Sequence, residues 1–372
     1  MEREDLKRYS RHLALPDFTE ESQDKLKNSK VIVVGAGGLG SPVLQYLTAA
    51  GVGTIGIIDY DVVEISNLQR QVIFTEADLG KPKAQVAAER LKLLNSKVKF
   101  NIYLEKLTSD NALELLKPYD LIIDGTDNFP SRYLINDSSV ILNKPFIYGS
   151  VYRFEGQVAV FNYAYNDGKR GSNYRDLFPE PPPPDLVPNC EEGGVIGVMP
   201  GIIGTMQAAE AIKIITGIGE VLSGKLLIID IQTFQISKIK IQNKKDSTVI
   251  NELIDYNEFC ATKSKSMLFG PKVKEMDSIA LKELMDSGEE FQLIDVRESY
   301  EYDQDNLGGE LIPLGQIMNE SSKIRKDIKV IIHCRSGSRS AAAIKHLEKQ
   351  FGFDNLYNLK GGIINWHTKF GY

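Results

Sequence analysis

One cysteine of this sequence stands where a thiol could act as a nucleophile. Cys334 follows the apolar run 328–333 and begins the segment CRSGSR, residues 334–339, which leads into a predicted helix over 340–351. The backbone N–H groups of a tight loop, the N-terminus of a helix and nearby arginines all favour a thiolate over a thiol. The sequence therefore predicts a reactive sulfur at Cys334, held in a loop that contains Arg335, Ser336, Gly337, Ser338 and Arg339.

A second cysteine, Cys190, follows the proline-rich stretch PEPPPPDLVP at 179–188, which can form neither a helix nor a central strand. We predict a crossover loop over 167–192. Two interpretations of Cys190 stay open: a partly buried structural thiol, and a nucleophile toward an activated carboxyl group. The third cysteine, Cys260, lies far from both others in sequence. Because no C-x-x-C is present, we expect no disulfide framework and an inert Cys260.

A phosphate-binding turn is predicted where the apolar run KVIVV at 30–34 is followed by Gly35, Gly37 and Gly40. The backbone N–H groups of such a turn can approach a phosphate. Asp59, at the end of the next predicted strand, can accept a hydrogen bond from a ribose hydroxyl. This motif alone predicts a nucleotide, and it also fits a nicotinamide-dependent dehydrogenase or a Rossmann turn that binds no ligand.

The polar residues after this turn favour ATP over a nicotinamide cofactor. Asn67 and Arg70 lie in a polar segment that is too long for a simple β–α turn. Lys83 lies at the start of a predicted helix, and Asp127 follows the predicted buried strand 120–124. An enzyme that cleaves ATP needs cations against the phosphate charge and a carboxylate that holds Mg²⁺. We therefore predict that ATP binds with Mg²⁺, and that Asp127 binds the metal.

Strands and helices must alternate along the chain to position these residues, because ligands bind at the carboxyl ends of parallel strands. The hydrophobic patterning predicts strands at 30–34, 54–59, 98–104, 120–124, 146–150, 157–162, 225–231 and 237–242. The predicted fold class is α/β: a Rossmann-like domain with a mixed sheet extension, followed by a smaller α/β domain.

A polar, irregular stretch separates these two domains. The chain of 372 residues, 42% hydrophobic, is long enough for both. After the polar stretch, a second α/β pattern shows a helix at 278–285 and strands at 291–295 and 328–333. We predict an ATP-binding domain at 1–245, a linker at 246–271 and the smaller domain at 272–372.

Charge and hydropathy argue against two kinds of partner. A formal net charge of −6 disfavours general affinity for nucleic acid. The N-terminus is charged, and no stretch approaches the length of a membrane span. We expect a cytoplasmic protein with no nucleic acid and no membrane partner.

Five motifs of the first domain resemble the MoeB/ThiF adenylyltransferases, bacterial relatives of ubiquitin-activating enzymes. They are VVGAGGLG at 33–40, DYDVV at 59–63, SNLQRQ at 66–71, GKPKA at 80–84 and DGTDN at 124–128. The resemblance covers about residues 3–242 and implies ATP-binding residues Gly38, Asp59, Ser66, Asn67, Arg70, Lys83, Asp127 and Asn128. Among these it implies catalytic roles for Arg70, Lys83 and Asp127. It also implies a homodimer in which Arg11 reaches the ATP of the partner subunit.

The chain departs from this family at its zinc site. In most relatives a C-x-x-C lies at 173–176 and a second cysteine pair lies near Cys260, and together they hold zinc. This chain has Asn173 and Asp176 at the first pair and keeps only Cys260 of the second. No structural zinc is therefore expected. The segment PNCEEGGV around Cys190 does match the family's cysteine segment, which implies a catalytic role for it.

The second domain resembles the rhodanese sulfurtransferases over about residues 272–370. The matching motifs are LIDVRESYE at 293–301, HCRSGSR at 333–339 and KGGIINW at 360–366. Tyrosine phosphatases have a similar loop with five residues between cysteine and arginine. Four residues separate Cys334 from Arg339 here, and the shorter loop suits a terminal sulfur.

Together, the resemblances imply an enzyme that adenylates and then thiolates a small ubiquitin-like sulfur-carrier protein. Cys334 would receive sulfur from an outside donor, a cysteine desulfurase or thiosulfate, and attack the adenylated carrier. Cys190 would resolve the acyl disulfide or hold the carrier as a thioester. Whether the carrier serves molybdopterin or thiamine biosynthesis, tRNA thiolation or another pathway stays open.

Three other interpretations predict different activities. A nicotinamide oxidoreductase would transfer hydride without pyrophosphate exchange, and a pseudoenzyme would bind without turnover. The closest alternative is a ubiquitin-like-protein activating enzyme that works through a Cys190 thioester without sulfur transfer. The complete loop at Cys334 disfavours it.

Overall fold

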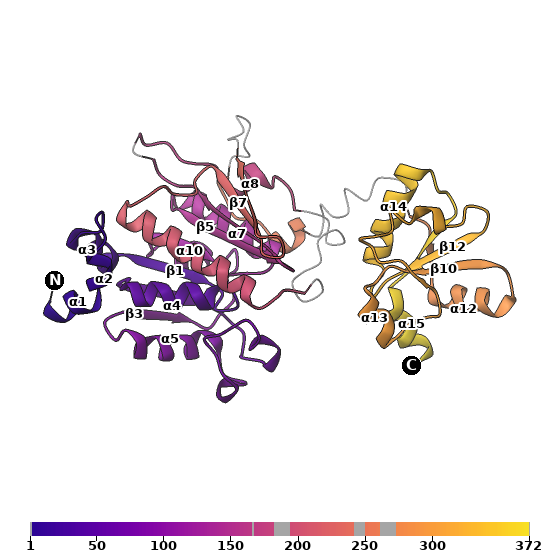
Figure 1. Ribbon diagram of the computed structural model, residues 1–372, viewed down its shortest axis with the longest axis horizontal. Coiled ribbons are helices and arrows are strands. Elements are labelled where there is room, and N and C mark those ends of the chain that lie inside the picture. The colour runs from indigo at the N-terminus through magenta and orange to yellow at the C-terminus, as the bar shows by residue number, and fades with distance from the viewer. Residues whose placement is uncertain (1, 166, 182–193, 242–249, 261–272, 372) are drawn as a thin grey trace. The chain divides into compact units, whose positions relative to one another are not determined.

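The computed structural model describes residues 2–165, 167–181, 194–241, 250–260 and 273–371. These residues fall into two compact units, both drawn in Figure 1. Residues up to 260 form unit 1, and residues from 273 form unit 2. Each unit has its own sheet and its own hydrophobic cores, which confirms the predicted α/β fold class with a larger and a smaller domain.

Unit 1 is built on an eight-stranded sheet in the order β3-β2-β1-β4-β5-β6-β7-β8. Neighbouring strands from β3 to β5 pair in parallel, whereas β6, β7 and β8 are added antiparallel, so the sheet is mixed. The strands are β1 (Lys30–Val34), β2 (Thr54–Ile58), β3 (Lys99–Tyr103), β4 (Leu121–Asp124), β5 (Phe146–Tyr152), β6 (Glu155–Phe161), β7 (Lys225–Asp230) and β8 (Gln235–Lys240).

Helices cover both faces of the parallel part of this sheet. Strand β1 shows why: Val31 and Val33 belong to one core, and Ile32 and Val34 belong to the other. An apolar parallel strand is stable only when both of its faces are buried. The helices are α1 (Arg3–Arg8), α2 (Ser10–Leu13), α3 (Glu20–Asn28), α4 (Gly40–Ala50), α5 (Lys83–Leu94), α6 (Ala112–Leu116), α7 (Phe129–Ile141), α8 (Tyr174–Leu177) and α10 (Val198–Thr216), with 3₁₀ turns η1 (Ile65–Asn67) and η2 (Glu76–Asp78).

Helix α10 is the longest apolar helix of the described residues. It has 19 residues with a mean hydropathy of 1.2, and within the described part of the chain it alone is long and apolar enough to cross a membrane. The expectation that no stretch approaches that length was therefore wrong for this helix. It packs against α4, β5 and β6, beside the sheet as Figure 1 shows. Its apolar composition suits a helix that packs against both the sheet and α4.

The strand order reverses between β1 and β4, because the chain proceeds from β1 to β2 on one side and returns to β4 on the other. Loops that leave two such strands diverge and leave a crevice at their carboxyl ends. Gly35 after β1 has φ +94°, and a Cβ there would lie 2.7 Å from the carbonyl oxygen of Gly125 after β4. Glycine is therefore required where the two loops touch.

Residues 250–260 pack against unit 1. The side chain of Tyr256 is 4% exposed, and Leu253 and Phe259 pack against the same core as α7. The described part of the predicted linker 246–271 therefore belongs to unit 1. The predicted domain boundaries at 245 and 272 lie outside the described residues and stay predictions.

The predicted crossover loop at 167–192 is described only up to residue 181. This part contains the short helix α8, which we did not predict. Cys190 lies outside the described residues.

Unit 2 contains a five-stranded parallel sheet in the order β11-β10-β12-β13-β9. On its central strand, Val330 and Ile332 belong to the core under α14, and Ile331 faces the core on the opposite side. The strands are β9 (Glu275–Met276), β10 (Phe291–Asp295), β11 (Glu310–Leu311), β12 (Lys329–His333) and β13 (Leu356–Leu359). The helices are α12 (Ser278–Ser287), α13 (Ser299–Gln304), α14 (Ser338–Phe351) and α15 (Gly362–Phe370), with the 3₁₀ turn η4 (Ser321–Lys323).

Candidate functional site

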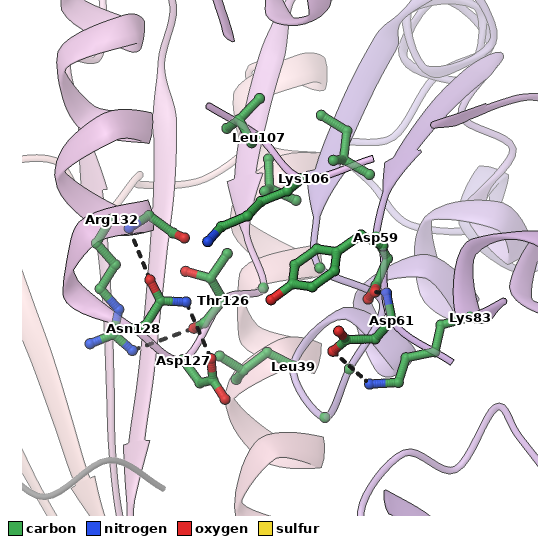
Figure 2. Close-up of a pocket in the computed structure, with 18 of the residues that line it drawn as sticks. Leu39, Asp59, Asp61, Lys83, Lys106, Leu107, Thr126, Asp127, Asn128 and Arg132 are labelled. Atoms are coloured by element: carbon green, nitrogen blue, oxygen red, sulfur yellow. Dashed lines mark hydrogen bonds and ion pairs between the residues drawn. The ribbon is translucent and has the colours of Figure 1, made fainter. Parts of the chain in front are cut away.

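A pocket of about 380 Å³ lies in unit 1 at the carboxyl ends of β1, β2 and β4. Figure 2 shows Asp59, Asp61 and Lys83 on one side of it and Asp127 and Asn128 on the other. Six of the eight residues predicted to bind ATP line this pocket: Gly38, Asp59, Arg70, Lys83, Asp127 and Asn128.

The glycine turn allows helix α4 to begin directly against β1. A Cβ at Gly40 would lie 2.0 Å from the carbonyl oxygen of Gly35, so a side chain there would separate the helix from the strand. The start of α4 and the backbone of Gly37 and Gly38 therefore border the pocket directly. Backbone N–H groups at such a helix start suit a phosphate.

Asp59 is fixed by two backbone N–H groups. Its Oδ2 accepts from Ala36 and its Oδ1 accepts from Asp61, each at 2.8 Å. Burial raises the pKa of Asp59, and these two N–H donors oppose that shift. Each carboxylate oxygen keeps acceptor capacity, so the side chain can receive a ribose hydroxyl.

Lys83 lies at the start of α5 and is 6% exposed. Its ammonium forms an ion pair with Asp61, with Nζ 3.2 Å from Oδ2. We did not predict Asp61, although its position two residues after Asp59 was a usable signal. The pair aims the lysine into the pocket and gives the buried ammonium a partner.

Ser66 and Asn67 do not line the pocket, and they hold the segment that carries Arg70. Asn67 Oδ1 accepts the N–H of Glu64 at 3.1 Å, and Arg70 Nη1 donates to the carbonyl of Ser66 at 3.0 Å. The 3₁₀ turn η1 thus explains why this segment is longer than a simple β–α turn.

The loop after β4 is organised by the fully buried carboxylate of Asp124. Its Oδ1 accepts from the N–H and the hydroxyl of Thr126, at 2.8 and 2.6 Å. Arg132 on α7 lies close by, with Nε 3.7 Å from Asp124 Oδ2. Burial raises the pKa of Asp124 to about 6. Asn128 accepts the N–H of Ser131 at 3.0 Å and caps α7.

Asp127 is exposed at the pocket edge, and within the described residues no group of three or more His, Cys, Asp or Glu side chains could hold a metal. A single carboxylate fits Mg²⁺, which takes its other ligands from phosphates and water. Asp127 would therefore hold Mg²⁺ together with a bound nucleotide.

Three further lining residues, Glu105, Lys106 and Leu107, follow β3 and were missed by the sequence analysis. Lys106 extends into the pocket in Figure 2, and its ammonium lies 5.9 Å from the ring centre of Tyr60. Leu107 lines the pocket beside it. Their place after a parallel strand was the signal that could have identified them.

Arg11 lies on α2, is exposed and does not line this pocket. The structure therefore does not bring Arg11 together with the other predicted residues of the same chain.

The segment at which the sequence departs from the expected zinc site is held by polar contacts. Asn173 caps α8 by accepting the N–H of Arg175 at 2.8 Å, and Asp176 accepts the N–H of Asn173 at 2.8 Å. Burial raises the pKa of Cys260 to about 11, so its thiol stays protonated at neutral pH.

In unit 2, Cys334 is buried at the end of β12, and its sulfur is surrounded by donors. Its Sγ accepts the N–H of Gly337 at 3.2 Å and the hydroxyl of Ser340 at 3.5 Å. Gly337 has φ +94°, which a glycine adopts without strain. The loop 334–339, called the Cys334 loop below, thus directs a backbone donor at this sulfur, and Ser340 on α14 adds a hydroxyl.

The two arginines of the Cys334 loop differ. Arg335 is exposed, whereas Arg339 forms a bidentate ion pair with Glu301, with both N–O distances 2.7 Å. The prediction that two arginines favour the thiolate is thus modified, because a carboxylate offsets one of them. Burial lowers the pKa of His333 to about 4, so the residue before Cys334 is uncharged at neutral pH.

The geometry defines a class of protein: a nucleotide-binding α/β unit joined to a parallel α/β unit with a thiol held at a helix start. A model of the ThiF family matches residues 9–250, and a model of the rhodanese-like domain matches residues 279–369. The chain belongs to the ThiF family and carries a rhodanese-like domain after it, which confirms both resemblances.

Three relatives match this chain over two thirds of its length or more. The chain is 45% identical over 369 residues to a probable adenylyltransferase/sulfurtransferase, MoeZ, of Mycobacterium tuberculosis, covering 98% of this chain and 94% of that protein. It is 50% identical over 264 residues to a sulfur carrier protein adenylyltransferase of Thermus thermophilus, covering 69% and 97%. It is 39% identical over 386 residues to an adenylyltransferase and sulfurtransferase, MOCS3-2, of Drosophila pseudoobscura pseudoobscura, covering 98% and 83%.

Solved structures resemble about two thirds of the chain. MccB of E. coli with ATP has a TM-score of 0.56 at 25% identity, covering 65% of this chain and 73% of that one. PaaA has a TM-score of 0.55 at 26% identity, covering 66% and 76%.

Proposed function

We propose that the chain is an adenylyltransferase and sulfurtransferase that activates the C-terminal glycine of a small ubiquitin-like sulfur-carrier protein and converts it to a thiocarboxylate. The observation that carries this proposal is the presence, in one chain, of the pocket with Asp59, Lys83 and Asp127 and of the donor-lined sulfur of Cys334. The name of the Thermus thermophilus relative supports a sulfur carrier as the substrate. Residues 1–245 would carry out the first reaction and residues 272–372 the second.

In the first reaction, a carboxylate oxygen of the carrier attacks the α-phosphorus of ATP, and the bond to the bridging oxygen breaks. Pyrophosphate leaves with the electron pair, and an acyl adenylate remains. Asp59 would orient the ribose, while Lys83 and Arg70 would neutralise charge on the phosphates. Mg²⁺ held by Asp127 would add positive charge at the leaving pyrophosphate.

In the second reaction, the outer sulfur of a Cys334 persulfide attacks the acyl carbon, and AMP leaves. The product is an acyl disulfide between the carrier and Cys334. A thiol, for which we propose Cys190, attacks the sulfur of Cys334 and releases the carrier thiocarboxylate. The resulting disulfide between the two enzyme cysteines is reduced by an external thiol.

We also propose an oligomeric state, a cellular compartment and a sulfur donor for these reactions. We propose a homodimer in which Arg11 contacts the ATP of the partner subunit, because Arg11 does not line the pocket of its own chain. We propose a cytoplasmic enzyme whose sulfur donor is a cysteine desulfurase or thiosulfate. The carrier would serve molybdopterin or thiamine biosynthesis or a related thiolation pathway.

Carrier-dependent ATP–pyrophosphate exchange with a panel of purified ubiquitin-like carriers tests the proposal. One carrier should stimulate exchange and, with thiosulfate, gain one sulfur atom by intact mass. Exchange without any sulfur gain would favour an activating enzyme that works through Cys190. Failure of every carrier to stimulate exchange would contradict the proposal.

A further inference from the structure

The two arginines of the Cys334 loop differ in how their charge is compensated. Arg339 donates through Nη1 and Nη2 to the two carboxylate oxygens of Glu301 on α13, each at 2.7 Å. The side chains are 20% and 15% exposed. A bidentate pair of this kind is both stronger and more directional than a single contact, so the guanidinium of Arg339 is held toward α13.

Glu301 is held in place by its own helix as well. Its Oε2 accepts the backbone N–H of Glu298 at 3.1 Å and closes a capping box at the start of α13. Burial alone would raise the pKa of Glu301, but the hydrogen bonds from Arg339 and Glu298 outweigh it and hold the pKa below its ordinary value. The carboxylate is therefore ionised at neutral pH and cancels the charge of Arg339.

The charge of Arg335, in contrast, is not compensated. This residue directly follows Cys334, it is exposed, and no carboxylate among the residues that the structure describes pairs with it. Two other cations of unit 2 do have carboxylate partners: Arg297 is 4% exposed and donates to Asp295 at 2.7 Å, and Lys360 lies 3.7 Å from Glu275.

We propose that Glu301 determines which sulfur donors the Cys334 loop prefers, according to the negative charge that the donor carries. By neutralising Arg339 it leaves one uncompensated guanidinium, Arg335, at the loop, which suits a donor with a single negative charge, such as a persulfide or a thiosulfonate, better than doubly charged thiosulfate. Glu301 acts through Arg339 and is a specificity-determining residue that does not touch the reacting sulfur. This inference rests on the proposed sulfurtransferase function.

Two donors that react in the same way isolate this effect. The thiolate of Cys334 bonds to the outer sulfur of the donor, and the bond between the two donor sulfurs breaks. The electron pair leaves with sulfite from thiosulfate, or with methanesulfinate from methanethiosulfonate. Cyanide then takes the outer sulfur as thiocyanate and restores the thiolate. Neither reaction needs an oxidant or reductant, and the donors differ in carrying two charges or one.

The experiment measures kcat and KM of the full-length protein for both donors, with cyanide as acceptor. In Glu301→Gln, no carboxylate compensates the charge of Arg339. The KM for thiosulfate should then fall about fivefold relative to the KM for methanethiosulfonate, as expected for one added net charge near the surface. The kcat values should change much less. The thiosulfate KM of this variant should also rise more steeply with salt than that of the wild type.

Glu283→Gln is the matched control, because it removes the same charge from an exposed position on α12. Its ratio of KM values should equal that of the wild type. A Glu301→Gln protein that transfers sulfur with an unchanged ratio, or with both KM values lowered equally, would overturn the inference.

A second variant keeps the inference testable if Glu301→Gln does not fold. Arg339→Gln leaves the carboxylate of Glu301 uncompensated, so the KM for thiosulfate should rise more than the KM for methanethiosulfonate. An equal rise for both donors would overturn the inference. A wild-type protein that takes sulfur from neither donor would instead overturn the proposed sulfurtransferase function, and this inference with it.

Discussion

Arg175 and Asp137 form a bidentate ion pair, with Nε 2.9 Å from Oδ1 and Nη2 2.7 Å from Oδ2. The side chains are 9% and 3% exposed. The hydroxyl of Tyr256 donates to the same carboxylate at 2.8 Å, and the guanidinium lies over the rings of Tyr133 and Phe259, 5.0 and 4.8 Å from their centres. These contacts join α7, α8 and the segment 250–260.

We therefore expect Arg175→Ala to destabilise unit 1. The change leaves Asp137 buried without its cation, which typically costs about 3 kcal/mol, or a fall of roughly 6–12 °C in Tm for a unit of this size. Thermal unfolding measures this loss. Lys169→Ala, which breaks an exposed ion pair, is the control and should change stability little.

Metal content independently tests the expectation that this part of unit 1 holds no structural zinc. Protein purified without chelators should contain less than one zinc per chain, and chelation should not lower the Tm. Stoichiometric zinc would show that Asn173, Asp176 and Cys260 were misjudged.

Asp127→Ala should abolish ATP–pyrophosphate exchange, with a loss of at least about 100-fold, because the carboxylate that would hold Mg²⁺ is removed. Transfer of sulfur from thiosulfate to cyanide should persist, since it depends on unit 2. Asp110→Ala, at an exposed acidic position, is the control. Exchange at the wild-type rate in Asp127→Ala would refute the assignment of the ATP site.

Mixing two inactive variants tests the role of Arg11. If Arg11 completes the site of the partner subunit, a hybrid of Arg11→Ala and Asp127→Ala has one site free of both changes. Exchange activity should then recover when the subunits are allowed to swap. Mass spectrometry of the intact dimer must confirm the hybrid, and a confirmed hybrid without activity would argue against an arginine that acts across the dimer.

Asp124 should make stability depend on pH. Burial raises its pKa from 3.8 to about 6 in the folded state. The folded protein thus binds this proton more tightly than the unfolded chain, so the contribution to stability is fully present below about pH 4 and is lost as the pH rises through 6.

Asp124→Asn removes this contribution at every pH. Relative to the wild type, the variant should gain up to about 3 kcal/mol of unfolding free energy between pH 4 and pH 7, measured by urea unfolding. If the free energies of unfolding of the two proteins change with pH in parallel, Asp124 titrates in its ordinary range and the prediction is wrong.

The two cysteines should divide the sulfur reactions between them. Cys334→Ala should still support pyrophosphate exchange but form no thiocarboxylate from thiosulfate. Cys190→Ala should accept sulfur on Cys334 and stop at a later step, with a covalent carrier adduct at Cys334. Intact masses of enzyme and carrier distinguish these cases. A Cys334→Ala protein that thiolates the carrier normally would refute the sulfurtransferase role.

The sequence by itself determined the α/β class, the central strands and the positions of the glycine turn and the Cys334 loop. These features depend on local patterns, because a buried parallel strand needs a continuous apolar run and a tight turn needs glycine. Strand ends also indicated one edge for Asp59 and Asp127. The short helix α8 was missed because proline and polar residues dominate the surrounding segment.

Only the tertiary structure decided which charges compensate one another. The partners of Lys83, Arg175 and Arg339 are Asp61, Asp137 and Glu301, which lie 22, 38 and 38 positions away in sequence. No local pattern predicts such pairs, because they depend on how separate helices and loops pack. Since an ion pair cancels a charge that the sequence shows as free, the electrostatic character of both sites follows from packing and could not be read from residue types alone.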